Sequence, residues 1–316
     1  RKAKVSLVIW ANHNLRASIT AMREVSATIL RDQTIAAVEN EVATVSDIFE
    51  LAGNAELSNA EKIYLPTSQG GAKAIVLAAS RGSALGDLTA DRPKCMLDIR
   101  GKPLLGRLID TLKGGGIRDI TVVRGYRKEM VNLPTVKTID NDQFETTGEV
   151  STLACAADKL KGETILAYGD VLFRQYIIDQ IAEIDGDIVL AVDALWRERD
   201  PDPASRTRDL VSSSTPFNTG YLNDEVISVR EIGHDLKANE IDGEWIGVAS
   251  LSADGAATVR DELNNMSADG SLEKASLTDL FTRLLARNVP IQILYVAGQW
   301  LDIDNPGDLK DASSFL

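Results

Sequence analysis

The chain has 316 residues, of which 44% are hydrophobic and 26% charged, and its formal net charge is −13. This length favours two domains with sizeable cores, and the composition is ordinary for a globular protein. The acidic balance argues against a general nucleic-acid binder, which would present a basic face, and no apolar run is long enough to span a membrane.

The N-terminal residues predict one strand and several helices. An apolar run at residues 4–11 is typical of a buried strand, and apolar spacing predicts helices over residues 15–34, 44–51 and 59–64. The chain opens Arg-Lys-Ala-Lys, without Met or a signal peptide, so we expect residue 1 to lie inside a longer natural sequence. Two cysteines, Cys95 and Cys155, show no zinc or disulfide spacing, which predicts a reducing, cytoplasmic location.

The run VIWANHNLRASITAM, with VENEVATVSDIFEL and AEKIYLP after it, resembles the C-terminal end of phosphoenolpyruvate mutase, of the isocitrate lyase superfamily. The resemblance covers residues 1–66 and implies the last strand and helices of a (β/α)8 barrel. It also implies that the rest of the mutase barrel is missing from this chain and that homo-oligomers form through this part. No mutase activity is therefore expected here. Residues 67–72 are typical of a flexible linker.

Residues 73–316 alternate between strand and helix patterns, which predicts an α/β domain with a Rossmann-like, mixed but mostly parallel sheet flanked by helices. A helix is expected over residues 104–113, and residues 196–242 are polar and irregular, as in a lid or substrate-facing insertion. The expected strands are residues 74–79, 120–123, 135–139, 164–168, 187–193 and 291–296.

Residues 73–105, KAIVLAASRGSALGDLTADRPKCMLDIRGKPLL, combine a buried strand with a small-residue loop whose N–H groups can approach a phosphate chain. Neither the Walker pattern nor the dinucleotide fingerprint is present. The stretch resembles the nucleotidyltransferases that activate sugar phosphates, phosphocholine and phosphonates, whose signature is LAAGxGxRL…PLT…PK…L…GKPLL. Two positions depart from it, because Ala84 replaces an arginine and Ser80 the first glycine.

The resemblance assigns roles to residues of this stretch and of later motifs. Lys94 is the predicted catalytic cation, and Arg81 and Arg92 are nearby cations that would substitute for the lost arginine. The segment TGEVSTL stands where relatives read T-N-N-x-x-S-L and contact the nucleotide. The predicted nucleotide-binding residues are Leu77, Ala78, Ala79, Ser80, Arg81, Gly82, Ser83, Thr147, Thr152 and Gly169.

Two further motifs complete the expected site. Asp170 follows an apolar strand, at the sheet edge where ligands bind in open α/β folds, and the resemblance implies that it holds a catalytic Mg²⁺. Asp302 and Asp304, an i, i+2 pair in WLDID, would complete this all-oxygen site. The segment GEWIG resembles phosphonate-type relatives, so Glu244 and Trp245 are the predicted acceptor contacts, able to hold an ammonium group.

The resemblance implies transfer of CMP from CTP to a phosphonate such as 2-aminoethylphosphonate or 2-hydroxyethylphosphonate, with release of pyrophosphate, since the adjoining mutase would make a phosphonate precursor. The expected partners are CTP and this small phosphonate, with Mg²⁺ as cofactor. Two alternatives stay open: a nucleotidyltransferase for phosphocholine or a sugar 1-phosphate, and a catalytically inactive nucleotide-binding regulatory domain. Ala84 motivates the second alternative, and the retention of Lys94 and the acidic residues weighs against it.

Overall fold

The computed structural model describes residues 12–35, 38, 42–43, 71–199, 207–217 and 226–315. Contacts divide the chain into two units, Arg1–Thr67 and Ser68–Leu316, and each is considered by itself. The strand expected at residues 4–11, the helices at 44–51 and 59–64 and most of the linker lie outside the described residues. The barrel remnant therefore stays a prediction.

In the first unit, helix α1 (His13–Asp32) confirms the helix expected at residues 15–34. It ends where Gln33 takes a left-handed conformation with φ of 51°, and the Gln33 N–H donates to Ile29 O. Of all helices in the described ranges, none combines the length and the apolar character that crossing a membrane requires.

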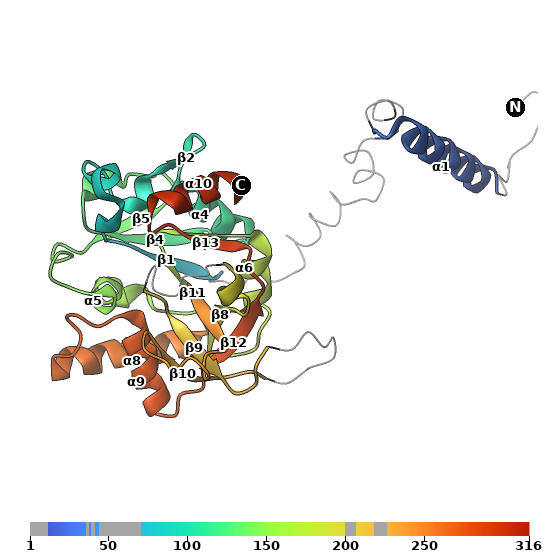
Figure 1. The fold of residues 1–316 in the computed structure, drawn as a ribbon. Coiled ribbons are helices and arrows are strands. Elements are labelled where there is room, and N and C mark those ends of the chain that lie inside the picture. Colours follow the sequence, from blue (N-terminus) through green and yellow to red (C-terminus); the bar gives the residue numbers. More distant parts are fainter. Residues whose placement is uncertain are drawn as a thin grey trace, which may run out of the picture. The chain divides into compact units, whose positions relative to one another are not determined.

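The second unit is built around a central sheet (Figure 1). Strand β1 (Lys73–Ala78) pairs in parallel with both β4 (Asp119–Arg124) and β6 (Thr164–Tyr168). The remaining strands of this sheet are β5 (Lys137–Asp140), β8 (Ile188–Asp193), β9 (Leu210–Ser213), β10 (Val229–Gly233), β11 (Gly243–Leu251) and β12 (Gln292–Val296).

The sheet runs in the order β10-β9-β11-β6-β1-β4-β5, with β8 on β11 and β12 on β8. Strands β4 and β5, and β8 and β12, are parallel pairs, whereas β11 is antiparallel to β6, β8 and β9. The prediction of a mixed, mostly parallel sheet is confirmed, and the expected strands at 74–79, 120–123, 135–139, 164–168, 187–193 and 291–296 are all present.

Helices cover both faces of the sheet. On one face, α4 (Leu104–Gly114) and α6 (Gln175–Ile181) bury leucine and isoleucine side chains against the strands. On the other, α5 (Glu149–Ala154), α8 (Ala253–Asp269) and α9 (Leu277–Ala286) bury leucine, valine, methionine and phenylalanine side chains. Apolar burial on both faces explains why the strands are continuous hydrophobic runs rather than alternating ones. The described residues of this unit also form α7 (Trp196–Arg199) and α10 (Pro306–Phe315).

A small antiparallel ribbon lies beside the main sheet. Strand β7 (Val171–Phe173) pairs with β13 (Trp300–Asp302), so that Asp302 lies opposite Val171. A separate apolar cluster supports the ribbon and the hairpin β2 (Asp98–Ile99) and β3 (Lys102–Pro103): Ile99, Leu104, Leu172, Ile303 and Ala312. This cluster brings residues from the first part of the domain, at positions 99 and 104, together with residues near its C-terminal end, at positions 303 and 312.

The expectation that residues 196–242 are irregular is wrong where regular elements lie in the described part of that segment, at residues 196–199, 210–213 and 229–233. It contains β9 and β10, which pair with each other, and β9 also pairs with β11. Both strands are short and partly polar, and β9 pairs with strands that come later in the chain. Local hydrophobic periodicity therefore carries little signal for them.

Candidate active site

A cleft of about 610 Å³ opens at the carboxyl ends of β1 and β6, the usual ligand position in an open α/β sheet. A second cavity of about 520 Å³ adjoins it and shares Ser80, Ala84, Lys94, Phe144 and Asp304 with it. The loop at residues 80–84 therefore borders both spaces, as a phosphate-binding loop would.

Hydrogen bonds hold this loop in place. Lys94 N donates to Arg81 O at 3.2 Å, and the buried Thr89 hydroxyl donates to Gly82 O at 3.1 Å. Gly82 has φ of 74°, a backbone conformation that residues other than glycine adopt only at a cost in stability. The threonine and the lysine of the motif, several residues downstream, thus fix the loop that precedes them.

The predicted nucleotide-binding residues of β1 and its loop divide into two groups. Leu77, Ala79 and Ser80 line the main cleft, and Ser80, Arg81, Gly82 and Ser83 line the second cavity. Ala78 and Gly169 line neither: a Cβ at Gly169 would lie 2.7 Å from Ala78 Cβ. These two residues allow β1 and the end of β6 to approach closely.

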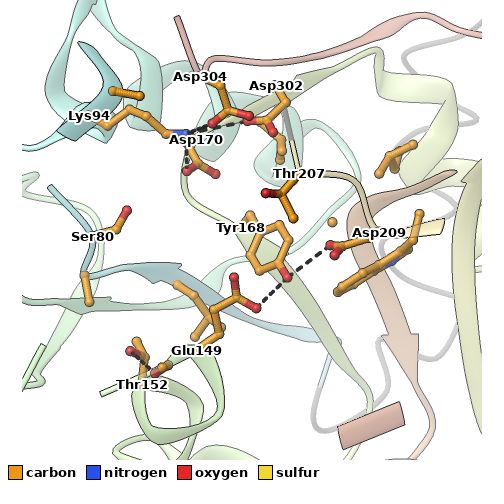
Figure 2. A pocket seen from close by; sticks show the side chains of 18 of the residues that line it. Ser80, Lys94, Glu149, Thr152, Tyr168, Asp170, Thr207, Asp209, Asp302 and Asp304 are labelled. Atoms are coloured by element: carbon orange, nitrogen blue, oxygen red, sulfur yellow. Dashed lines mark hydrogen bonds and ion pairs between the residues drawn. The ribbon is translucent and has the colours of Figure 1, made fainter. Parts of the chain in front are cut away.

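Three aspartates surround the ammonium of Lys94 (Figure 2). Its Nζ lies 2.6 Å from Asp304 Oδ1, 2.9 Å from Asp170 Oδ2 and 3.7 Å from Asp302 Oδ1. Lys94 is only 6% exposed. The structure thus brings together the predicted catalytic lysine and all three predicted metal ligands, from segments some 130 residues apart in the sequence (Asp170 to Asp302).

This cluster carries more negative than positive charge. Burial lowers the pKa of Lys94, but Asp170, Asp302 and Asp304 together raise it above its ordinary value. Burial raises the pKa of Asp302 well above its ordinary range; Lys94 opposes that shift and the other two aspartates add to it. A further cation would therefore be stabilised here, and the all-oxygen donor set is the one that Mg²⁺ prefers.

As the side chains stand, Lys94 occupies the space between the aspartates. Among the residues that the structure describes, no three carboxylate, imidazole or thiolate groups are arranged to hold a metal ion. The metal role of Asp170, Asp302 and Asp304 fits the donor chemistry and stays a prediction.

A second polar group lines the cleft away from Lys94, and sequence reasoning missed it. The Tyr168 hydroxyl donates to Glu149 Oε2 at 2.7 Å and lies 3.3 Å from Asp209 Oδ2 (Figure 2). Glu149 also accepts a hydrogen bond from the Leu277 N–H, at the start of α9. His234 Nδ1 lies 3.5 Å from Asp209 Oδ1. The only sequence signal was Glu149 itself, which replaces an asparagine of the relatives' motif.

Within this group, the pKa of the Asp209 carboxyl is raised. Burial is the largest cause, followed by the charge of Glu149, and His234 and the Tyr168 hydroxyl oppose them; together they raise the pKa of Asp209 to about 7. Burial, Asp209 and Glu149 also raise the pKa of Tyr168 well above its ordinary value. The carboxyl of Asp209 therefore changes its charge near neutral pH, and a bound cation would favour its ionised form.

Thr147 and Thr152 both line the cleft, and both hydroxyls are held by one side chain. Asn141 Nδ2 lies 3.1 Å from Thr147 Oγ1 and 3.0 Å from Thr152 Oγ1. Asn141 is buried at the end of β5. The amide therefore fixes the two predicted nucleotide contacts, a role that no local motif indicated.

The predicted acceptor residues Glu244 and Trp245 line the cleft, but each is only 2% exposed. The Trp245 ring packs between Tyr168 and Phe281, and its Nε1 donates to Val248 O at 2.8 Å. Glu244 Oε2 lies 3.7 Å from the Arg208 guanidinium. These contacts belong to the core, so the indole face offers an incoming cation little area.

The two predicted substitute cations lie in different surroundings. Arg81 lines the second cavity and stacks over Tyr126, with its guanidinium carbon 5.6 Å from the ring centroid. Arg92 lines neither cavity and pairs instead with Asp91 at 3.0 Å on the surface. Arg81 thus borders the space left by Ala84, and the structure does not bring Arg92 there.

Comparison with known proteins identifies the domain. Residues 74–212, which include the loop, Lys94, Tyr168 and Asp170, match the family described as MobA-like NTP transferase domain. The chain is a nucleotidyltransferase. It is 26% identical over 258 residues to the CTP:phosphoglutamine cytidylyltransferase of Campylobacter jejuni, covering 75% of this chain and 97% of that protein.

Two further relatives match shorter stretches. The chain is 28% identical over 118 residues to the CMP-5'-(3-aminopropyl)phosphonate synthase of Streptomyces rubellomurinus, covering 35% of this chain and 19% of that protein. It is 49% identical over 65 residues to the phosphoenolpyruvate phosphomutase of Tetrahymena pyriformis, covering 21% of this chain and 22% of the mutase. The mutase resemblance is therefore real but confined to a short segment.

Among solved structures, the CTP:phosphocholine cytidylyltransferase of Streptococcus pneumoniae superposes with a TM-score of 0.59 at 19% identity, covering 77% of this chain and 98% of that one. This likeness shows the fold. The predictions of the fold class and of a nucleotidyltransferase are confirmed, whereas the acceptor and the roles of single residues remain predictions.

Proposed function

We propose that this nucleotidyltransferase transfers CMP from CTP to a small phosphonate that carries an amino group, with release of pyrophosphate. The observation that carries the proposal is the single cleft with Lys94 and three aspartates at one end and the Glu149–Tyr168–Asp209 group farther along. The first end suits a phosphate chain that brings its own counter-ions, and the second suits a cationic head group.

The reaction needs positioning more than a protein nucleophile. An oxygen of the acceptor phosphonate, already an anion, attacks the α-phosphorus of CTP in line. The bond from that phosphorus to the bridging oxygen breaks, and pyrophosphate leaves with the electron pair. Lys94 stabilises the negative charge that develops on the α-phosphate, and the N–H groups of the loop at residues 80–86 hold the triphosphate.

The donor chemistry of the same site suits a divalent cation. Asp170, Asp302 and Asp304 would hold Mg²⁺, which when bound supplies positive charge to the phosphate oxygens. Because Lys94 already pairs with these carboxylates, the lysine also keeps the three of them close together before substrate binds.

The choice of nucleotide and acceptor is supported by the relatives and by the cleft. Cytidylyltransferases of phosphoglutamine and aminopropylphosphonate are among the relatives, and a mutase segment supports a phosphonate. Glu149 and Asp209 are hydrogen-bond acceptors, which favour an ammonium with N–H donors over the hydroxyl of 2-hydroxyethylphosphonate. They also favour it over the methylated ammonium of phosphocholine, which has no N–H to donate.

Pyrophosphate release tests the proposal. Purified protein with Mg²⁺ is given each nucleoside triphosphate against 2-aminoethylphosphonate, 2-hydroxyethylphosphonate, phosphonopyruvate, phosphocholine and glucose 1-phosphate. We expect turnover with CTP and 2-aminoethylphosphonate, abolished in Asp170→Ala and retained in the surface variant Asp254→Ala. Preferred turnover of glucose 1-phosphate would identify the protein as a nucleotidyltransferase for a sugar 1-phosphate. Nucleotide binding without any turnover would favour the inactive regulatory alternative.

A further inference from the structure

The carboxylate of Asp193 is buried and lies outside the proposed chemistry. It ends β8, is 0% exposed and accepts three hydrogen bonds, each of 2.9 Å. The donors are the Leu195 N–H, the Gly298 N–H and the Trp300 indole Nε1–H. A buried carboxyl group is costly unless hydrogen-bond donors satisfy it, and these three donors, from two segments distant in the sequence, do so.

One of the three donors, the Gly298 N–H, belongs to the turn that leads into β13, and another, the Trp300 indole, is on the first residue of that strand. Gly298 and Gln299 both have positive φ, at 65° and 63°, which for the glutamine is an unfavourable conformation. Outside this turn, Arg174 N–H donates to Gln299 O at 3.1 Å. The turn therefore depends on partners elsewhere in the fold, and Asp193 accepts one hydrogen bond from it and one from the first residue of β13.

The strand after the turn carries the active-site acids. Trp300 pairs with Phe173 and Asp302 with Val171, and the Ile303 N–H donates to Asp170 O at 3.3 Å. Trp300 and Asp302 are two residues apart on an extended strand, so their side chains leave the same face, and both line the cleft. A shift of the Trp300 side chain would therefore move Asp302 relative to Lys94.

We propose that Asp193 is a positioning residue that sets the affinity of the site for its divalent cation. By holding Gly298 and the Trp300 indole, it fixes the start of β13 and thus the places of Asp302 and Asp304 beside Lys94 and Asp170. This inference rests on the proposed function only in taking Asp302 and Asp304 as the cation's ligands. Supporting groups of this kind typically change metal affinity or activity by about 10- to 100-fold.

Substitution by asparagine tests the contact without changing the volume of the side chain. In Asp193→Asn, the oxygen can still accept from Leu195 and Gly298, but the amide NH₂ then faces the Trp300 indole N–H, donor against donor. Trp300→Phe removes that indole donor. In the double variant the clash is relieved, so its loss is expected to be no larger than that of Asp193→Asn alone.

The matched control is Glu262→Gln, a change at another buried carboxylate. Glu262 is 1% exposed and joins α8 to α9 through Arg283, at 2.7 Å, and Arg287. It lines neither cavity of the site. Its removal is expected to lower the melting temperature and to leave cation binding unchanged.

The measurements are the binding of Mn²⁺ to the full chain, followed by the electron paramagnetic resonance of free Mn²⁺, the Mg²⁺ concentration for half-maximal pyrophosphate release, and the melting temperature. We expect Asp193→Asn to weaken Mn²⁺ binding by about 10-fold and to raise the half-maximal Mg²⁺ concentration similarly. Wild-type Mn²⁺ binding in Asp193→Asn, with only a lower melting temperature, would make Asp193 purely structural and overturn the proposal.

The two proposals fail in different ways. A wild-type protein that binds Mn²⁺ but releases no pyrophosphate with any acceptor contradicts the proposed function, and the Mn²⁺ comparison still decides the role of Asp193. A wild-type protein that turns over but binds no Mn²⁺ in the absence of nucleotide overturns the role of Asp193 alone.

Discussion

The backbone of Gly82 lies directly against the side chain of Lys94. A Cβ added at Gly82 would be 2.7 Å from Lys94 Cβ and 2.8 Å from Lys94 Cδ, closer than carbon atoms pack. The glycine of the loop is therefore required twice, once for its φ of 74° and once for the space that the lysine stem occupies.

Gly82→Ala is expected to displace Lys94 from the three aspartates. The left-handed backbone costs alanine about 1–2 kcal/mol of stability, and the displaced ammonium lowers kcat by about 100-fold. Gly162→Ala is the matched control, since Gly162 has the same φ of 74° but nothing within 4 Å of an added Cβ. Both variants should have a lower melting temperature because of the left-handed backbone, with the larger decrease in Gly82→Ala, and equal kcat losses in the two would contradict the contact with Lys94.

Lys94→Met removes the ammonium while keeping most of the stem. We expect kcat to fall by about 100- to 1,000-fold, as for the loss of one group that stabilises transition-state charge. The three carboxylates are then left without their cation, so added Mg²⁺ should raise the melting temperature of this variant more than that of the wild type. Lys137→Met is the control, because Lys137 pairs with Asp119 on the surface. An unchanged kcat in Lys94→Met would contradict a catalytic role for Lys94.

The preference of the enzyme for an acceptor with an amino group should depend on pH, because of Asp209. Its pKa of about 7 means that the carboxylate becomes charged as the pH rises from 6 to 8. The KM for 2-aminoethylphosphonate should therefore fall relative to that for 2-hydroxyethylphosphonate over this range, and the comparison cancels ionisation of the phosphonate itself. In Asp209→Asn the ratio of the two KM values should approach one and lose its pH dependence. If that variant keeps the wild-type ratio of the two KM values, Asp209 does not determine acceptor preference.

The same carboxyl predicts the direction of a stability change. The pKa of Asp209 is raised on folding, from 3.8 to about 7, so between these values the folded state binds more protons than the unfolded one. The free energy of unfolding therefore decreases as the pH rises through this window. Denaturant titrations at pH 5 and pH 8 should show a smaller decrease for Asp209→Asn than for the wild type. A decrease of equal size would mean that Asp209 does not cause it.

Tyr168→Phe removes the hydroxyl and keeps the ring, so it tests the role of the hydroxyl alone. Loss of the hydrogen bond to Glu149 is expected to cost about 1 kcal/mol and to raise the KM for the amino acceptor, because Glu149 and Asp209 lose their shared donor. Tyr295→Phe also loses a hydroxyl hydrogen bond, at 2.9 Å to Ser213, and Tyr295 does not line the cleft. It should lose comparable stability with an unchanged KM, and a parallel rise in KM for both variants would argue against a direct role.

Much of the fold and half of the candidate site could be predicted from the sequence. The continuous apolar runs of β1, β6 and β8 are buried on both faces, so their composition alone indicates a parallel core. The loop at residues 80–86, Lys94, Asp170 and the pair Asp302 and Asp304 lie in local motifs that resemble those of nucleotidyltransferases, and the resemblance implied their roles.

Other features depend on contacts between segments distant in the sequence, and only the tertiary structure decided them. Asp209 acquires its acidity because β6, β9 and α5 meet at one cleft, and Asp193 reaches Trp300 more than 100 residues further on. Trp245 lies in a motif that indicates substrate contact, yet packing buries it between Tyr168 and Phe281. Periodicity and motif spacing describe neighbours along the chain, whereas burial and charge environment are set by neighbours in space.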